Sequence, residues 1–235
     1  MRCLAIIPAF NEEASVGDVV GDIREAWPGA DVVVVDDGSS DATAAKARAA
    51  GASVVQLPFN LGVGGAMRVG YKLALSDDYD VAVQVDADGQ HDPREIAALV
   101  EALRDADIVI GARFAGRGDY ETRGPRRWAM KLLARSLSRT CKTELTDVTS
   151  GFRAANRRAV AMFAAHYPAE YLGDTVESLV MAARAGLRVT QVPVAMRPRT
   201  AGTPSQTPIR AALYLGRAIL VLGMARVRRL PGEER

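Results

Sequence analysis

Short runs of apolar and β-branched residues recur along the first half of the chain, and most are apolar at successive positions. This pattern is typical of strands that are covered on both faces, as in a mostly parallel sheet. The runs predict five strands, at residues 3–7, 31–35, 53–57, 81–85 and 107–110.

Helix start signals lie between the predicted strands. Asn11 is placed to cap a helix that ends at Ala26, Asp41 to cap a helix over 42–50, and Asp92-Pro93 to begin a helix over 94–104. The alternation of strand and helix indicates a doubly wound α/β fold, in which ligands bind at the carboxyl ends of the strands.

The second half of the chain has a different rhythm. Residues 111–124 and 198–208 are rich in Gly, Arg, Pro and hydroxyl residues, which predicts two long loops. We expect helices at 126–139, 156–165, 175–185 and 209–230, and strands at 149–154 and 188–194. No repeat or clear linker divides the chain into separate domains.

Composition and charge narrow the function classes. The chain has 235 residues, 49% apolar and 25% charged, as in an ordinary globular protein. Its two cysteines exclude a disulfide framework and a four-cysteine zinc site, and Cys3 is expected to be buried packing. Residues 1–112 carry 8 Lys and Arg against 19 Asp and Glu, whereas residues 113–235 carry 22 against 9. An acidic half suits a metal, and a basic half suits a phosphorylated partner or an anionic membrane.

The first predicted strand is followed by the segment PAFNE, residues 8–12. It lacks the glycine-rich turn of nicotinamide-binding folds and of sugar-nucleotide pyrophosphorylases, so both classes lose support. Phe10 offers a ring face to a base, and Glu12 offers a hydrogen-bonding edge. Asn11 is either a ligand contact or simply a helix cap.

Acidic residues follow two further predicted strands. Asp36 and Asp37 stand where a base or a ribose can be bound, while Asp41 is a cap. Asp86 and Asp88 alternate along the chain after residues 81–85, so both carboxylates can face one hard divalent cation. Gln90 has the reach to join them. Three glycines at 62–65 let the backbone approach an anion at a helix start, although no Walker motif follows.

Several segments together resemble family 2 glycosyltransferases of the GT-A fold. They are PAFNEE, VVDDGSSDAT, NLGVGGAMRVG, QVDADGQHDP, IGARF, DVTSGFRAANR and VPVAMRPRTAGTPS, which occur in the family's order over about residues 3–206. Within the family, the chain is most similar to the dolichyl- and polyprenyl-phosphate mannosyl- or glucosyltransferases. The resemblance implies a nucleotide-sugar donor, Mg²⁺ or Mn²⁺, and transfer with inversion at the anomeric carbon.

The resemblance also implies roles for individual residues. The implied donor-binding residues are Pro8, Ala9, Phe10, Asn11, Glu12, Val35, Asp36, Asp37, Gly62, Asp86 and Ala87. The implied metal ligands are Asp86, Asp88 and Gln90, the implied catalytic residues are Asp88, Arg113, Arg199 and Glu177, and the implied acceptor-binding residues are Arg126, Arg127, Lys131 and Ser150. We expect Arg113 and Arg199 to stabilise phosphate charge.

The acceptor defines the alternatives. A phosphate monoester is largely ionised at neutral pH and needs no general base, whereas a sugar hydroxyl needs a positioned carboxylate. Asp174 or Glu177 is available for that role, and Glu177 is equally suited to pair with an arginine. Pro204-Ser205-Gln206 departs from the lysine of the lipid-phosphate branch. The alternatives are therefore transfer to a glycan or small-molecule hydroxyl, or a non-catalytic sugar-nucleotide-binding module that works with a membrane protein.

The expected organisation is one GT-A domain over 1–206, with a donor and metal half (1–112) and an acceptor half (113–206), followed by a basic amphipathic tail (207–235). No signal peptide precedes the first apolar run, so we expect a cytoplasmic protein at the inner face of the cell membrane, with no nucleic-acid partner. The longest uncharged stretch of the tail, residues 218–225, is far shorter than the roughly 18 residues that span a bilayer.

Deletion of residues 209–235 is expected to release the protein from anionic liposomes and to leave donor binding intact. Arg210, Arg217 and Arg228 return to nearly one line of a helix, and each basic residue near the surface adds about 1 kcal/mol. Co-sedimentation with vesicles measures the effect. Equal sedimentation of the full-length and truncated proteins would assign the helix to packing on the domain or between two copies.

Overall fold

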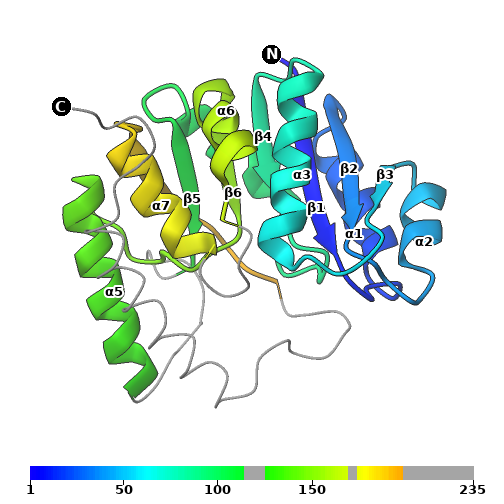
Figure 1. The fold of residues 1–235 in the computed structure, drawn as a ribbon, viewed down its shortest axis with the longest axis horizontal. Coiled ribbons are helices and arrows are strands. Elements are labelled where there is room, and N and C mark those ends of the chain that lie inside the picture. The colour runs from blue at the N-terminus through cyan, green and yellow to red at the C-terminus, as the bar shows by residue number, and fades with distance from the viewer. Residues whose placement is uncertain (114–124, 169–173, 198–235) are drawn as a thin grey trace.

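The apolar runs form the strands of a seven-stranded sheet in the computed structural model, which describes residues 1–113, 125–168 and 174–197 (Figure 1). The strands are β1 (Cys3–Ala9), β2 (Ala30–Asp36), β3 (Ser53–Gln56), β4 (Val81–Gln84), β5 (Ile108–Ala112), β6 (Arg153–Asn156) and β7 (Val189–Pro193). Their spatial order is β3-β2-β1-β4-β6-β5-β7. The five strands predicted in the first half are confirmed, with small shifts at their ends.

The sheet is mostly parallel, as predicted, but one strand runs in the opposite direction. Strands β1, β2, β3 and β4 pair in parallel, and so do β5 and β7. Strand β6 lies between β4 and β5 and is antiparallel to both. The chain therefore enters β6 at the edge where the parallel strands end.

Helices cover both faces of the sheet (Figure 1). They are α1 (Val16–Ala26), α2 (Thr43–Ala49), α3 (Val63–Ser76), the 3-10 helix η1 (Pro93–Glu95), α4 (Ile96–Ala102), α5 (Pro125–Cys141), α6 (Arg157–His166) and α7 (Asp174–Arg184). Apolar residues of α3, α5, α6 and α7 pack on one face, and those of α1, α2 and α4 pack on the other.

Strand β1 explains the continuous apolar pattern. Leu4 and Ile6 belong to one core, whereas Ala5 and Ile7 belong to the other, and all four are buried. Cys3 is buried as expected, and burial raises the pKa of its thiol to about 12. A strand buried on both faces has no polar side, so the run is apolar throughout.

Two predicted boundaries are wrong. Asn11 does not cap α1, which begins at Val16, because Asn11 adopts a left-handed φ of 55° and its side chain accepts a hydrogen bond from Ser40 N at 2.9 Å. The strand predicted at 149–154 is instead β6, Arg153–Asn156. Ser150 Oγ accepts from Phe152 N at 3.2 Å in a tight turn, which delays the strand.

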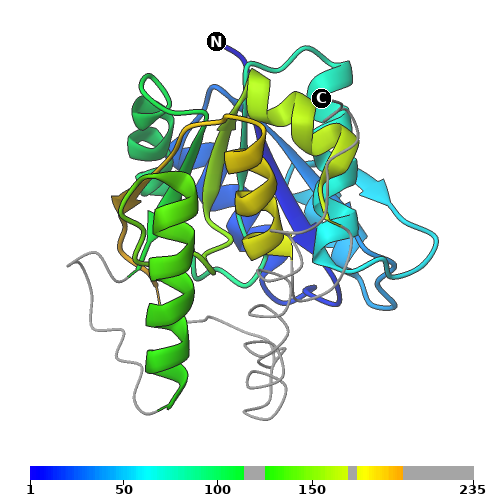
Figure 2. The same ribbon diagram turned by 60° about the vertical axis from the view of Figure 1, so that its left-hand side comes forward.

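The cap expected at Asp92 and the other expected helices within the described residues are confirmed. Helix α2 begins one residue later than predicted, so Ala42 is its N-cap, and Asp41 Oδ1 accepts from Thr43 N at 2.9 Å. Asp92 accepts from Arg94 N at 3.1 Å at the start of η1, which precedes the shorter α4, and Asn156 caps α6. The basic helix predicted at 126–139 is α5. Figure 2 shows α5 beside α7, with its N-terminal end extending beyond the carboxyl edge of the parallel strands. Residues 114–124 of the first predicted loop, the whole second predicted loop (198–208) and the tail helix lie outside the described residues.

None of the helices in the described ranges combines the length and apolar character that crossing a bilayer requires.

Replacement of Gly70 by Ala is expected to destabilise the fold by about 2 kcal/mol, because α3 packs closely on β1. A Cβ at Gly70 would lie 2.4 Å from Ile6 Cγ2. The control is Gly21→Ala on α1, where a Cβ meets nothing within 4 Å and helix propensity adds up to about 1 kcal/mol. Urea denaturation measures both; equal stabilities would contradict the close approach of α3 to β1.

Candidate active site

The carboxyl ends of β1, β2 and β4 meet at one edge of the sheet, because these parallel strands are neighbours. Asp37 N donates to Ala9 O at 2.8 Å, and Val85 N donates to Ile6 O at 3.0 Å. The segments that carry the predicted donor and metal residues therefore leave the sheet side by side.

The loop after β1 is bound to the loop after β2. Asn11 N donates to Ser39 Oγ at 2.9 Å, and Glu12 N donates to Thr43 Oγ1 at 2.8 Å. Phe10 stands at this edge with 47% of its surface exposed, so its ring is accessible to a ligand. Pro8 and Ala9, the other donor residues predicted here, form the end of β1.

Asp36 and Asp37 are buried, and their carboxylates accept hydrogen bonds from backbone amides of loops at this edge. Asp36 Oδ1 accepts from Ser39 N at 3.0 Å, and Asp37 Oδ1 accepts from Leu61 N at 2.7 Å. Burial raises the pKa of Asp37, although hydrogen bonds from the amides of Leu61 and Gly62 act in the opposite direction. Asp37 therefore fixes the loop before α3, whereas Asp36 holds its own loop and the end of β3, where Gln56 Nε2 donates to its Oδ2 at 3.3 Å. Val35 before them is fully buried in the core.

The predicted metal ligands follow β4. Asp86 has a side chain that is 39% exposed, Asp88 is buried, and Ala87 between them packs in the apolar core. Residues 87 and 88 form a turn after β4, so the extended chain assumed in the prediction ends before the second carboxylate. Asp88 Oδ1 accepts from Gln90 N at 3.0 Å, which folds the loop back after a left-handed Gly89.

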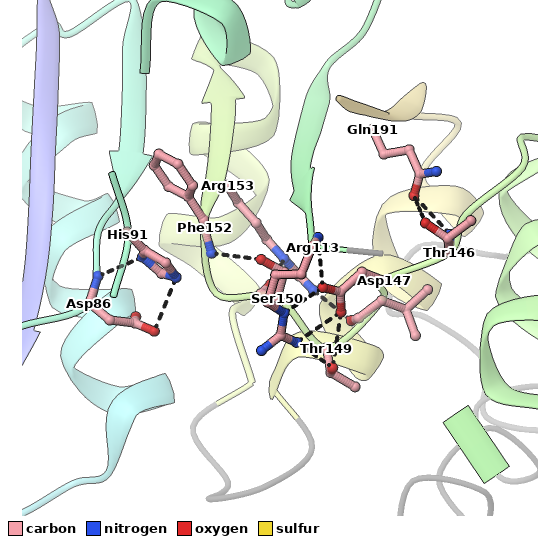
Figure 3. A network of polar contacts seen from close by, with 11 residues as sticks. Asp86, His91, Arg113, Thr146, Asp147, Thr149, Ser150, Phe152, Arg153 and Gln191 are labelled. Atoms are coloured by element: carbon pink, nitrogen blue, oxygen red, sulfur yellow. Dashed lines mark hydrogen bonds and ion pairs between the residues drawn. The ribbon is translucent and has the colours of Figure 1, made fainter. Parts of the chain in front are cut away.

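His91 holds Asp86 from the other side of this loop (Figure 3). Its Nδ1 accepts from Asp86 N at 3.0 Å, its Nε2 lies 3.5 Å from Asp86 Oδ2, and its ring stacks on Phe152 with centroids 4.7 Å apart. No role follows for His91 from the sequence alone. The structure gives it one, since it fixes the backbone of Asp86, the first predicted metal ligand.

Gly151 approaches the same carboxylate from the turn before β6. A Cβ at this position would lie 2.9 Å from Gln84 Nε2 and 3.0 Å from Asp86 Oδ1. Gln84 Nε2 itself donates to Asp86 Oδ1 at 3.2 Å, while Gln84 Oε1 is buried without a hydrogen-bond partner among the described residues. Asp86 is therefore enclosed by residues of both β4 and the β6 turn.

Arg113 follows β5 and is held by a buried aspartate (Figure 3). Its Nε donates to Asp147 Oδ2 at 2.6 Å and its Nη2 donates to Asp147 Oδ1 at 2.9 Å, with Thr149 Oγ1 at 3.0 Å from Nη2. Burial disfavours the charged Asp147, but the hydrogen bonds and charge of Arg113 outweigh it and hold its pKa below the usual range. Asp147 is not among the predicted site residues, but it begins the segment DVTSGFRAANR, one of the segments that carry the family resemblance.

Arg153 joins the turn before β6 to helix α7. It is buried and donates to the carbonyl oxygens of Val148 at 2.9 Å, Ser150 at 2.8 Å and Thr175 at 2.9 Å. Ser150, predicted to bind the acceptor, is also buried, and its hydroxyl is engaged in the local turn.

Asp174 and Glu177 lie in the first turn of α7. Asp174 is 4% exposed, and burial raises its pKa to about 6, while Arg153 acts to lower the pKa and Asp86 to raise it. Glu177 is partly buried. Arg153 Nη1 donates to Thr175 O at 2.9 Å, so this helix start is linked to the turn before β6 that approaches Asp86.

The basic residues predicted for the acceptor are only partly described. Lys131 is exposed on α5. The side chains of Arg126 and Arg127, and all of Arg199, lie outside what the structure describes, so their roles remain predictions.

The family model of glycosyl transferase family 2 matches residues 4–163. The chain is a family 2 glycosyltransferase. It is 37% identical to an undecaprenyl-phosphate mannosyltransferase from Micrococcus luteus over 214 residues, which cover 86% of each chain. It is 34% identical to a polyprenol monophosphomannose synthase from Mycolicibacterium smegmatis, with 68% of this chain and 63% of that one aligned. The resemblance drawn from the motifs is confirmed.

The fold of this glycosyltransferase matches a crystallised glucosyl-3-phosphoglycerate synthase from Mycobacterium tuberculosis, with a TM-score of 0.72 over 98% of this chain and 82% of that chain. The two sequences are 24% identical, so the likeness concerns the fold, and it confirms the expected GT-A architecture. That relative was crystallised with Mn²⁺, UDP-glucose and phosphoglyceric acid, and another crystal contained Mg²⁺ and UDP.

The residues at the end of β4 fit a hard divalent cation. Asp86, Asp88 and Gln90 offer oxygen donors, and the unpartnered Gln84 Oε1 adds a buried polar atom beside them. Within the described ranges, no group of three or more His, Cys, Asp and Glu is placed to hold a metal.

Replacement of Gly151 by Ala is expected to raise the dissociation constant for Mn²⁺ with GDP or UDP about tenfold, because the added methyl group displaces the Asp86 carboxylate. Isothermal titration calorimetry measures the change. Gly29→Ala is the control, since a Cβ there meets nothing within 4 Å. If Gly151→Ala binds Mn²⁺ and nucleotide as tightly as the wild type and melts at the same temperature, the turn before β6 does not influence the metal site.

Proposed function

We propose that this glycosyltransferase moves a hexose from GDP-mannose or UDP-glucose to a polyprenyl phosphate at the surface of the membrane. The observation that carries the proposal is the 37% identity, over 86% of both chains, to an enzyme whose name specifies undecaprenyl phosphate as the acceptor. The loops after β1, β2 and β4 support the donor half of the proposal, because they meet at one edge.

The donor is bound by the β1 and β2 loops, with Phe10 facing the base and Asp86, Asp88 and Gln90 facing the diphosphate. A bound Mg²⁺ or Mn²⁺ supplies Lewis-acid stabilisation of the negative charge that grows on the leaving diphosphate. Arg113 adds a positive group whose orientation is fixed in advance by Asp147. Arg199 is proposed to contact phosphate in the same way.

The carboxylates of α7 favour a phosphate acceptor over a hydroxyl. A general base must reach the proton that it removes, but Asp174 is buried and its carboxylate accepts hydrogen bonds from backbone amides at the start of its own helix. An ionised phosphate needs no such base. Glu177 is proposed to hold positive groups of the site in place.

The acceptor is proposed to approach from the basic half of the chain. Residues 113–235 carry 22 Lys and Arg against 9 Asp and Glu, and Lys131 is exposed on α5, whose N-terminal end extends beyond the strand ends (Figure 2). Arg126, Arg127 and Ser150 complete the proposed acceptor region. A basic surface also suits anionic lipids at the cytoplasmic face, where a polyprenyl chain is anchored.

Radiolabelled GDP-mannose and UDP-glucose, each incubated with Mn²⁺ and undecaprenyl phosphate, test the proposal. Label is expected in the organic phase for one of the two donors. A parallel reaction with phosphoglyceric acid tests a small-molecule hydroxyl acceptor. Label that passes only to the soluble acceptor would overturn the lipid-phosphate assignment, and no transfer to either would favour a binding module.

Replacement of Asp88 by Asn is expected to reduce transfer by at least about 100-fold, because the amide keeps the shape and removes the charge that holds the cation. Binding of Mn²⁺ with the donor nucleotide should be lost in the same variant, while its melting temperature stays close to that of the wild type. Asp105→Asn, at an exposed carboxylate near the opposite end of β5, is the matched control. Full activity of Asp88→Asn would remove Asp88 from the metal site.

A further inference from the structure

Arg197 follows β7 and contacts the loop that carries the metal ligands. Its backbone N donates to Gln90 O at 2.9 Å, and its Nη2 donates to Asp92 Oδ1 at 2.9 Å. Its Nη1 pairs with Asp22 on α1. Arg197 thus connects helix α1 to the loop of residues 85–92 after β4, which carries the predicted metal ligands and is called the metal loop below.

The segment around Arg197 lies along the metal loop. Met196 and His91 form an isolated antiparallel bridge, and Ala195 N donates to Glu95 Oε1 at 3.4 Å just beyond the loop. Residues 194–197 therefore form a strap that runs from β7 across residues 90–95. The strap is extended, so the contacts of the Arg197 side chain decide how firmly its last residue is held.

The metal loop needs such support at Gln90. Gly89 has a left-handed φ of 76°, so the chain reverses just before Gln90, and Asp88 Oδ1 holds the nitrogen of Gln90. The carbonyl oxygen of Gln90 is held by Arg197 N. Both peptide groups of Gln90 are thus fixed, one from within the loop and one from the strap.

We propose that Arg197 is a positioning residue for the metal site. Its two ion pairs anchor the strap, the strap fixes the carbonyl of Gln90, and the side chain of Gln90 is thereby directed toward the donor diphosphate and its cation. This inference rests on the proposed function, which assigns Gln90 to the metal. Arg197 differs in role from Arg199, because Arg197 acts through the metal loop and makes no contact with substrate in this proposal.

The first test measures binding of Mn²⁺–GDP and Mn²⁺–UDP to Arg197→Met by isothermal titration calorimetry. The dissociation constant of the nucleotide that the wild type binds is expected to rise about tenfold, as for other groups that orient metal ligands. The dissociation constant of Arg197→Lys should lie between those of the wild type and Arg197→Met, since one ammonium group cannot bridge both carboxylates.

Arg94→Met is the matched control. Arg94 also pairs with Asp92, but its side chain is 74% exposed, and its hydrogen bonds to described residues go to Asp92 and not to the strap or Gln90. The affinity of Arg94→Met for the Mn²⁺–nucleotide should stay within about twofold of that of the wild type. Asp92 keeps one arginine in either variant, so no buried carboxylate is left without a cationic partner.

A double-mutant cycle with Asp22→Asn separates positioning from a general effect on stability. Asp22 is 44% exposed on α1, so its variant should fold even if Arg197→Met does not. Asp22→Asn is expected to weaken nucleotide binding about threefold in the wild type and to have no further effect in Arg197→Met. Additive effects, or wild-type affinity in both single variants, would overturn the positioning role.

The outcomes also separate this inference from the proposed function. A wild-type protein that binds Mn²⁺–nucleotide and shows the expected cycle, but transfers no sugar to undecaprenyl phosphate, would leave Arg197 in its role and overturn the acceptor. Normal transfer and normal nucleotide affinity in Arg197→Met would overturn the positioning role of Arg197 and leave the proposed acceptor in place.

Discussion

The site depends on a single reversal within the sheet, the antiparallel insertion of β6 between β4 and β5. Each parallel strand is followed by a loop at the carboxyl edge of the sheet. Because β6 is antiparallel, the segment at this edge is the one that precedes it. The turn at residues 147–151 therefore lies against the ends of β4 and β5. Asp147 can then pair with Arg113, and Gly151 can close on Asp86, although the chain separates the two segments by more than thirty residues.

Polar contacts between loops, more than contacts within them, give this edge its shape. The β1 loop is bound by Ser39 and Ser40, the loop before α3 by Asp37, and the metal loop by Arg197. Arg153 does the same for the turn before β6, with its charge buried among carbonyl oxygens. Since a half-satisfied buried network is costly, these loops have few alternative arrangements. The described part of this edge is held in place by contacts within the chain itself, which reduces the ordering cost of binding there.

The elements that follow from local pattern were predictable, and those that depend on distant partners were not. Strand β1 follows from burial on both faces, which makes the run apolar at every position. Strand β6 was misplaced because RAAN has no apolar run of its own and is defined by its neighbours. Asn11 is a residue type that commonly caps helices, but its side chain accepts a hydrogen bond from Ser40 N of the β2 loop, which the sequence pattern does not reveal. The Arg113–Asp147 pair needs the fold itself, because residue types alone do not reveal it.

The same insertion of β6 sets an order of assembly. Strand β5 pairs with β6 and β7, and Ala112 leaves the ribosome 41 residues before Arg153. Strands β1–β4 have all their parallel partners by then, but the outer edge of β4 and one edge of β5 stay open until β6 is synthesised, and the other edge of β5 stays open until β7. Open edges of apolar strands are templates for aggregation, so the nascent chain is most vulnerable in this interval. A fragment that stops before β6 would end with a detached apolar strand instead of a smaller complete sheet.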